Sequence, residues 1–241
     1  VQMGLLTAAG QAIALQLQSE EAAQGTSRML VLTEAEQSFV FANVPEAPVP
    51  SLLRSFSAPV VLDCEFSDAD LLTLLAHDSD PFNQWEASQR LGLRYALKFI
   101  AASADTESAN DQFGTEILPA DFVQAMRRVL QDDKLDAAFK DLVLTLPSES
   151  YIAEQLAEVD PQRVHTVREA MILQLASSLL PAWEAAWESN RATGAYTPDH
   201  VSAGRRALAG RALSMLCLNA VQTGDTIWPG KAYQRCKDAG N

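Results

Sequence analysis

Cysteine and histidine could hold a metal ion or supply a nucleophile and a base, and the chain has few of either. The cysteines are Cys64, Cys217 and Cys236, and the histidines are His77, His165 and His200. No two cysteines form a C-x-x-C pair, and no two histidines have the i, i+4 spacing that places two zinc ligands on one helical face. We therefore predict no metal or cofactor site in this chain, and the odd cysteine count favours a reducing, cytoplasmic compartment.

A catalytic nucleophile has no better support in the sequence. Cys64 or Ser57 could be combined with His77, but neither lies in a nucleophile motif, and no phosphate-binding glycine loop, G-x-S-x-G or H-E-x-x-H occurs. We interpret Cys64 as a strand residue at the edge of a sheet. His165 precedes Glu169 by one helical turn, which favours a surface pair over a catalytic role. The sequence thus predicts no catalytic residue.

The most concentrated positive charge lies at Arg205, Arg206 and Arg211. These side chains could face an anionic group such as a peptide carboxylate. The alternative is that they pair with neighbouring aspartates and glutamates. Whether any of them faces a substrate cavity stays open at this point.

Two tryptophans share one helical face. Trp183 and Trp187 are four residues apart, and Tyr196 follows them. The three rings could form an aromatic ligand box, but we favour packing of the tryptophans against a neighbouring helix.

Composition excludes several classes of protein. The chain has 241 residues, 48% of them hydrophobic, with 18 Lys and Arg against 31 Asp and Glu, a formal net charge of −13. So acidic a chain repels the phosphates of nucleic acid. No apolar run approaches the roughly 18 residues that span a bilayer, so we expect no membrane association. The chain does not begin with methionine, and we expect it to be a piece of a longer protein.

Residues 1–66 have the pattern of a partial β-sandwich. Short apolar runs separated by Gly, Ser, Asn and Pro predict strands at 1–6, 12–18, 28–32, 37–41 and 59–66. Three prolines in residues 43–50 predict a stiff, extended connection. Four or five strands would make an incomplete sandwich.

Residues 67–241 have helical periodicity and predict an irregular antiparallel helical array, solenoid-like in character. Helix starts are indicated by the capping sequence Ser67 to Asp70 and by Asp80–Pro81, Asp160–Pro161 and Thr197–Pro198. Helices are expected at about 81–102, 119–131, 134–146, 149–158, 161–189 with a break at Pro181, and 226–238. The predicted fold class is therefore mainly α, preceded by the small partial β-sandwich.

Two segments closely resemble bacterial aminopeptidase N, a zinc-dependent alanyl aminopeptidase of the gluzincin family. Residues 37–62 are similar to the end of the family's third, β-sandwich domain, above all at 39–41, 48–54 and 56–60. Residues 80–89 resemble the opening of the C-terminal helical domain, with Gln84 where a basic residue is expected. The similarity continues through 117–119 and 144–148 to 239–241.

The resemblance implies a four-domain enzyme whose zinc, held by two His and one Glu, lies in a domain preceding this segment. No position here matches those motifs, so no catalytic or ligand residue is carried over. The chain would be the end of the sandwich domain and the first part of the helical domain, inactive alone, helping to enclose the active site and limit access to it. The alternative is an independent helical-repeat module that binds a protein or peptide.

The expected partners are the catalytic domain of the same enzyme and its peptide substrates. Self-association is expected if the ends of the array are left open. The residues concerned are the strand at 1–6 and the apolar residues Leu213, Leu216, Leu218, Ile227, Trp228 and Tyr233.

Overall fold

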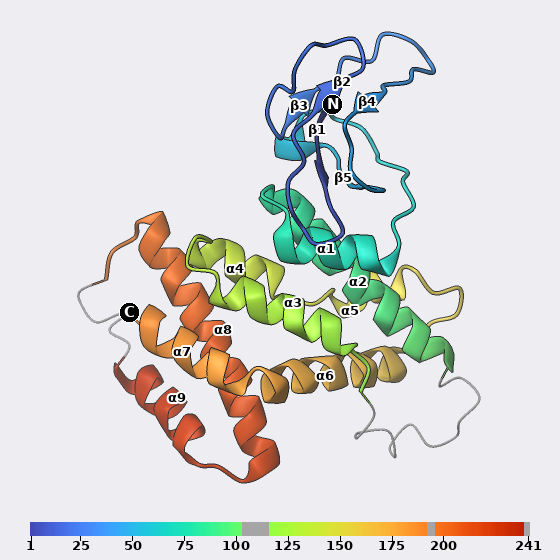
Figure 1. Cartoon of the computed structure of the whole chain (residues 1–241). Coiled ribbons are helices and arrows are strands. Elements are labelled where there is room, and N and C mark those ends of the chain that lie inside the picture. The colour runs from blue at the N-terminus through green and yellow to red at the C-terminus, as the bar shows by residue number, and fades with distance from the viewer. Residues whose placement is uncertain (103–115, 192–195, 239–241) are drawn as a thin grey trace. The chain divides into compact units, whose positions relative to one another are not determined.

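The computed structural model describes residues 1–102, 116–191 and 196–238. The chain is mainly helical, with a few short antiparallel strands before the first helix, as the sequence predicts (Figure 1). It divides into two compact units, residues 1–91 and 92–241, and the division falls inside helix α2 (Pro81–Ala102). The end of the resemblance at 239–241 lies outside the described residues.

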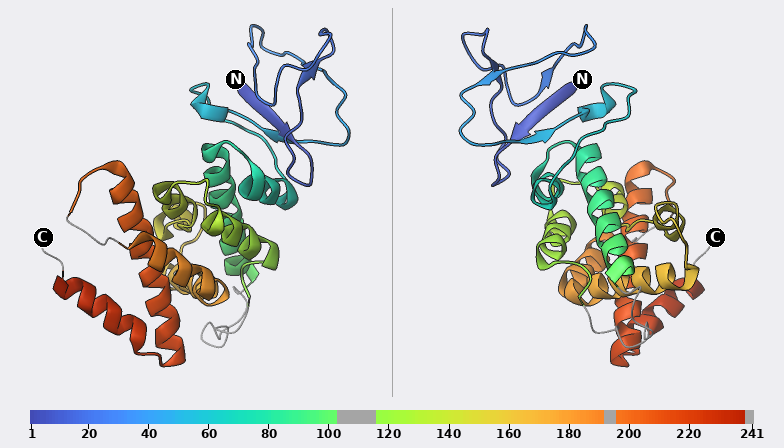
Figure 2. Two further views of the ribbon diagram at one scale, coloured as in Figure 1. Left: turned by 60° about the vertical axis from the view of Figure 1, so that its left-hand side comes forward. Right: turned by 90° about the vertical axis from the view of Figure 1, so that its right-hand side faces the viewer.

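Two small antiparallel sheets form the beginning of the first unit, where most of the chain is loop (Figure 2). The strands are β1 (Gln2–Leu6), β2 (Gln16–Leu17), β3 (Arg28–Met29), β4 (Phe41–Ala42) and β5 (Val49–Ser51). The sheets have the orders β3-β1-β5 and β2-β4. Their shared core consists of Met3, Leu5, Ile13, Leu15 and Leu30.

The strands predicted at 12–18, 28–32 and 37–41 are much shorter in the structure, and three further corrections are needed. The proline-rich connection supplies β5, in which Pro50 lies opposite Leu5 at the edge of the sheet, where a missing N–H is tolerated. Residues 59–66 form no strand, and Val61 is 97% exposed, because an apolar run becomes a strand only beside a partner. β1 is the middle strand of its sheet rather than an open edge.

Helix α1 (Asp68–His77) begins where the sequence predicts. The Ser67 hydroxyl accepts a hydrogen bond from the Asp70 N–H, and the Asp70 carboxylate accepts one from the Ser67 N–H, which completes a capping box. The Asp80 carboxylate likewise accepts the Asn83 N–H at 3.1 Å in the first turn of α2. Both starts follow from local hydrogen bonding.

The second unit is an array of helices around α8. These helices are α3 (Ala120–Gln131), α4 (Ala137–Val143), α5 (Glu149–Ala153), α6 (Pro161–Ser178), α7 (Leu180–Asn190), α8 (His200–Thr223) and α9 (Ile227–Asp238). Helix α8 packs against α4, α6, α7 and α9 (Figure 1). Its buried face alternates small and large residues, among them Leu208, Ala209, Ala212 and Leu216, so the neighbouring helices can approach closely.

Helix boundaries in this unit agree with the predictions at some positions and not at others. The break at Pro181 is confirmed, because α6 ends at Ser178 and α7 begins at Leu180. The last long helix begins later than predicted, since Asp199 rather than Thr197 accepts the N–H of Ser202. Helices α4 and α5 are shorter than predicted.

The last two helices bury only part of their apolar surface. Leu213, Leu216 and Trp228 are buried, whereas Ile227 and Tyr233 are each 63% exposed. Helix α9 thus packs against α8 with one face and leaves two large apolar side chains in solvent.

Candidate functional site

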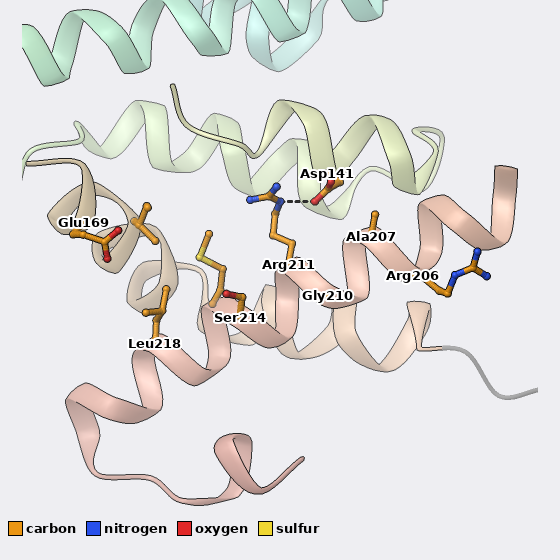
Figure 3. A pocket seen from close by; sticks show the side chains of 10 residues that line it. Asp141, Glu169, Arg206, Ala207, Gly210, Arg211, Ser214 and Leu218 are labelled. Atoms are coloured by element: carbon orange, nitrogen blue, oxygen red, sulfur yellow. Dashed lines mark hydrogen bonds and ion pairs between the residues drawn. The ribbon is translucent and has the colours of Figure 1, made fainter. Parts of the chain in front are cut away.

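A groove runs along one face of α8 in the helical unit, with a cavity of about 560 Å³ (Figure 3). Its floor consists of α8 residues spaced three or four apart, which therefore share one face: Arg206, Ala207, Gly210, Arg211, Ser214, Met215 and Leu218. Asp141 of α4 and Glu169 and Ile172 of α6 complete the lining. We call this site the α8 groove.

Arg211 is the most firmly held polar group of the α8 groove. Its Nε lies 2.5 Å from Asp141 Oδ1, and its Nη2 donates to the Thr145 hydroxyl at 2.6 Å. The Arg211 and Asp141 side chains are 23% and 22% exposed. Among the described residues these bonds use two of the five guanidinium N–H groups, so the rest can donate to a ligand (Figure 3).

Arg206 and Arg205 are held in a different way. Arg206 donates to the carbonyl of Thr197 at 2.9 Å and lies 4.6 Å from the centre of the Tyr196 ring. Arg205 donates to the carbonyl of Ser189 at 2.7 Å and is exposed. Pairing with a carboxylate is thus confirmed for Arg211, whereas Arg205 and Arg206 bond to backbone carbonyls. Two of the three arginines line the α8 groove.

The α8 groove carries equal numbers of opposite charges. Asp141 and Glu169 are acidic, and Arg206 and Arg211 are basic. Asp141 is already paired with Arg211, whereas the Glu169 side chain is 36% exposed and lies 4.0 Å from Arg168 on the same helix. The groove therefore offers a carboxylate and guanidinium N–H groups to one ligand.

The tryptophans pack in the core, as the sequence analysis favours. Trp183 is fully buried, and its indole N–H donates to the carbonyl of Leu175 at 3.0 Å. Trp187 is 7% exposed, while Tyr196 is 64% exposed. The three rings therefore form no common box.

The other candidate residues differ from expectation in their surroundings. His165 Nδ1 lies 2.8 Å from Glu149 Oε1, so its observed partner is on α5 rather than at Glu169. Cys64 lies in coil and not in a strand. The Ser57 hydroxyl accepts the N–H of Gln2 at 2.7 Å.

The family resemblance implies a zinc ion in a domain that precedes this segment, and the described residues do not form a site for it. Among the described residues, no three side chains of His, Cys, Asp or Glu lie together in a way that could hold a metal ion. His77 packs against Gly10, where an added Cβ would fall 2.2 Å from its ring, and His165 is engaged with Glu149.

None of the helices in the described ranges has the length and apolar character needed to cross a membrane.

Two family models match the chain. Residues 1–65 match a domain of unknown function, DUF3458, with an Ig-like fold, and residues 68–241 match a domain of unknown function, DUF3458_C, described as ARM repeats. The chain therefore belongs to the family that these two DUF3458 models describe. The descriptions agree with the small antiparallel sheets and the helical array seen here.

The resemblance to bacterial aminopeptidase N is confirmed. The chain is 34% identical to aminopeptidase N of Escherichia coli over 199 residues, which cover 83% of this chain and 22% of that protein. It is also 34% identical to aminopeptidase N of Caulobacter vibrioides over 182 residues, 76% of this chain and 20% of that one. The chain thus spans about a fifth of the length of these relatives.

A solved structure shares the fold. The crystal structure of Legionella pneumophila aminopeptidase A in complex with aspartic acid superposes with a TM-score of 0.67 and 24% identity. The match covers 92% of this chain and 24% of that one. The architecture of the chain therefore recurs within an aminopeptidase.

Sequence reasoning identified the arginines of the α8 groove but not their surroundings. Asp141 and Thr145 lie about 70 positions before Arg211 and carry no motif. The sequence signal that could have indicated the groove is the set of small residues Ala207, Gly210 and Ser214 on one face of a long helix. Such a face forms a groove only where a neighbouring helix does not cover it.

Proposed function

We propose that this chain is a non-catalytic portion of a zinc-dependent aminopeptidase N that removes N-terminal residues from peptides. The observation that carries the proposal is the 34% identity to aminopeptidase N of Escherichia coli over 199 residues, of which the chain spans 22%. The sequence contains no H-E-x-x-H motif, so zinc and the catalytic glutamate would be supplied by the rest of the enzyme.

The proposed domain organisation divides the chain at residues 66 and 67. The first segment would end a β-sandwich domain, and the second would begin a helical domain that encloses the active site and limits access to it. The ranges of the two family models, 1–65 and 68–241, support this division. An array of packed helices suits an enclosing role, because it forms an extended surface without needing catalytic groups of its own.

The proposed partners are the catalytic domain of the same enzyme and its peptide substrates, and the proposed compartment is the cytoplasm. Support for a reducing compartment comes from Cys64, Cys217 and Cys236, which are all free thiols.

Burial raises the pKa of the Cys217 thiol, so this side chain is not an activated nucleophile.

A chimera tests the proposed function. The region of Escherichia coli aminopeptidase N that aligns with this chain is replaced by this chain, and hydrolysis of an alanyl amide and of a long peptide is measured. We expect the amide to be hydrolysed, and we expect kcat/KM for the long peptide to change more than that for the amide, because the exchanged segment controls access. The unmodified enzyme is the control.

Two results would contradict the proposal. One is a chimera that folds and binds zinc but hydrolyses neither substrate. The other is an isolated chain that holds one zinc per molecule and cleaves the alanyl amide without a further domain. An independent peptide-binding module is the second candidate, favoured by the α8 groove, and it predicts a chimera without activity.

A further inference from the structure

We propose that the α8 groove binds a small zwitterion, a free amino acid or a short peptide, with its carboxylate on Arg211 and its ammonium group on Glu169. The proposal goes beyond the proposed function and does not depend on it. Three features of the groove support this binding: the fixed position of Arg211, the charge of Glu169 and the open space above Gly210.

Arg211 is ready to receive a carboxylate. Asp141 and Thr145 fix its guanidinium through Nε and Nη2, so little side-chain entropy is lost when a ligand binds. The remaining N–H groups lie in the plane of the fork that matches a carboxylate in a bidentate pair. Asp141 offsets much of the positive charge, so the site selects a ligand by geometry as well as by charge.

Glu169 provides the complementary charge. Its carboxylate belongs to α6 and lines the same cavity as Arg211 of α8 (Figure 3). Its contact with Arg168 is 4.0 Å long and partly exposed to solvent, so it is weak and can be exchanged for an ammonium group. A ligand that carries only one charge would engage only one of the two side chains, Glu169 or Arg211.

The remaining lining suits the body of such a ligand. Apart from its chain neighbours and the adjacent backbone of α8, a Cβ added at Gly210 would meet no described atom within 4 Å, so the floor of the groove is open at this residue. Ile172, Met215 and Leu218 supply apolar surface for a ligand side chain. The cavity of about 560 Å³ is within the usual range for small-molecule sites. These features favour ligands with an apolar side chain.

The test measures binding of L-leucine and of the dipeptide Leu-Leu to the purified 241-residue chain by titration calorimetry. N-acetyl-leucine, which lacks the ammonium group, and leucinamide, which lacks the carboxylate, are measured in parallel. We expect saturable binding of at least one zwitterion, and about tenfold weaker binding of both analogues, since each loses a charged hydrogen bond. The two zwitterions distinguish an amino-acid site from a peptide site.

Three variants locate the site. Glu169→Gln is expected to weaken binding by about tenfold, and Gly210→Leu is expected to abolish it by filling the open floor. Leucine has a higher helix propensity than glycine, so we expect the Gly210→Leu variant to stay folded. Thermal unfolding of the variant checks this. Glu184→Gln removes the same charge from an exposed position outside the groove and should leave binding unchanged.

The proposal is overturned if neither zwitterion binds saturably. It is also overturned if a folded Gly210→Leu variant binds as the unmodified chain does, or if N-acetyl-leucine and leucinamide both bind as tightly as leucine. Because the readout is binding to this chain, failure of the chimera described above would leave the result unaffected.

Discussion

Arg54 and Asp78 form a buried ion pair in the first unit. Arg54 Nη2 lies 3.0 Å from Asp78 Oδ1, and the two side chains are 8% and 0% exposed. Arg54 also donates to the Ser79 hydroxyl. Arg54 lies in a strained segment, since Leu53 and Ser55 on either side of it have φ angles of 55° and 54°.

Removing one member of this pair should be costly. We expect Arg54→Leu to lower the free energy of unfolding by about 3–5 kcal/mol, because it leaves the Asp78 charge buried without its partner. The double variant Arg54→Leu with Asp78→Leu should recover part of the loss, since no unpaired charge then remains. Urea denaturation of the three variants, including Asp78→Leu alone, checks this. If the losses of unfolding free energy in the two single variants add up to the loss in the double variant, the two side chains are not coupled.

The cost of Arg54→Leu should also depend on pH. Burial raises the pKa of Asp78 above its ordinary value of 3.8, although Ser51, the Asp80 N–H and Arg54 all oppose this shift. Removing Arg54 raises the pKa of Asp78 further. As pH rises from 3.8 through this raised pKa, the Arg54→Leu variant therefore loses more free energy of unfolding than the unmodified chain does. The difference in unfolding free energy between the two proteins should therefore narrow as pH falls from 7 to about 4. If the difference in unfolding free energy does not change with pH, the cost of Arg54→Leu does not come from the charge of Asp78.

Two glycines of α8 should respond in opposite ways to alanine. A Cβ at Gly204 would lie 2.8 Å from the backbone nitrogen of Ala138, so Gly204→Ala should destabilise the chain by about 1–3 kcal/mol. A Cβ at Gly210 meets no neighbour, so Gly210→Ala should stabilise it by about 0.5–1 kcal/mol through helix propensity. Thermal unfolding of both variants makes the comparison. Equal effects would show that α4 does not pack against α8 at Gly204.

Trp183 and Trp187 should differ in their sensitivity to replacement by phenylalanine. Trp183→Phe removes the hydrogen bond to the Leu175 carbonyl and leaves a cavity in the core. The indole nitrogen of Trp187 is buried without a hydrogen-bond partner among the described residues, so Trp187→Phe removes an unsatisfied donor. Denaturant midpoints should therefore fall further for Trp183→Phe. The reverse order would contradict these environments.

The sequence predicted the local features of the fold. Ser67, Asp160 and Pro181 mark helix boundaries that the structure confirms, because capping and proline sterics act within one or two turns of the chain. The last long helix is instructive, since Thr197 and Asp199 could each cap it, and the choice falls on Asp199. Aspartate is the stronger N-cap of the two residues, which agrees with this outcome.

Tertiary structure decided which segments pair and which groove stays open. Residues 49–51 become a strand because β1 lies beside them, whereas the apolar run around Val61 pairs with no strand of the described residues and stays in coil. Arg211 meets Asp141 across 70 residues of chain, and the floor at Gly210 is open because none of the described helices covers it. The sequence by itself determined where helices start and what chemistry their faces carry, since those are properties of neighbouring residues. The arrangement of the α8 groove depends on contacts between distant segments, which no local pattern encodes.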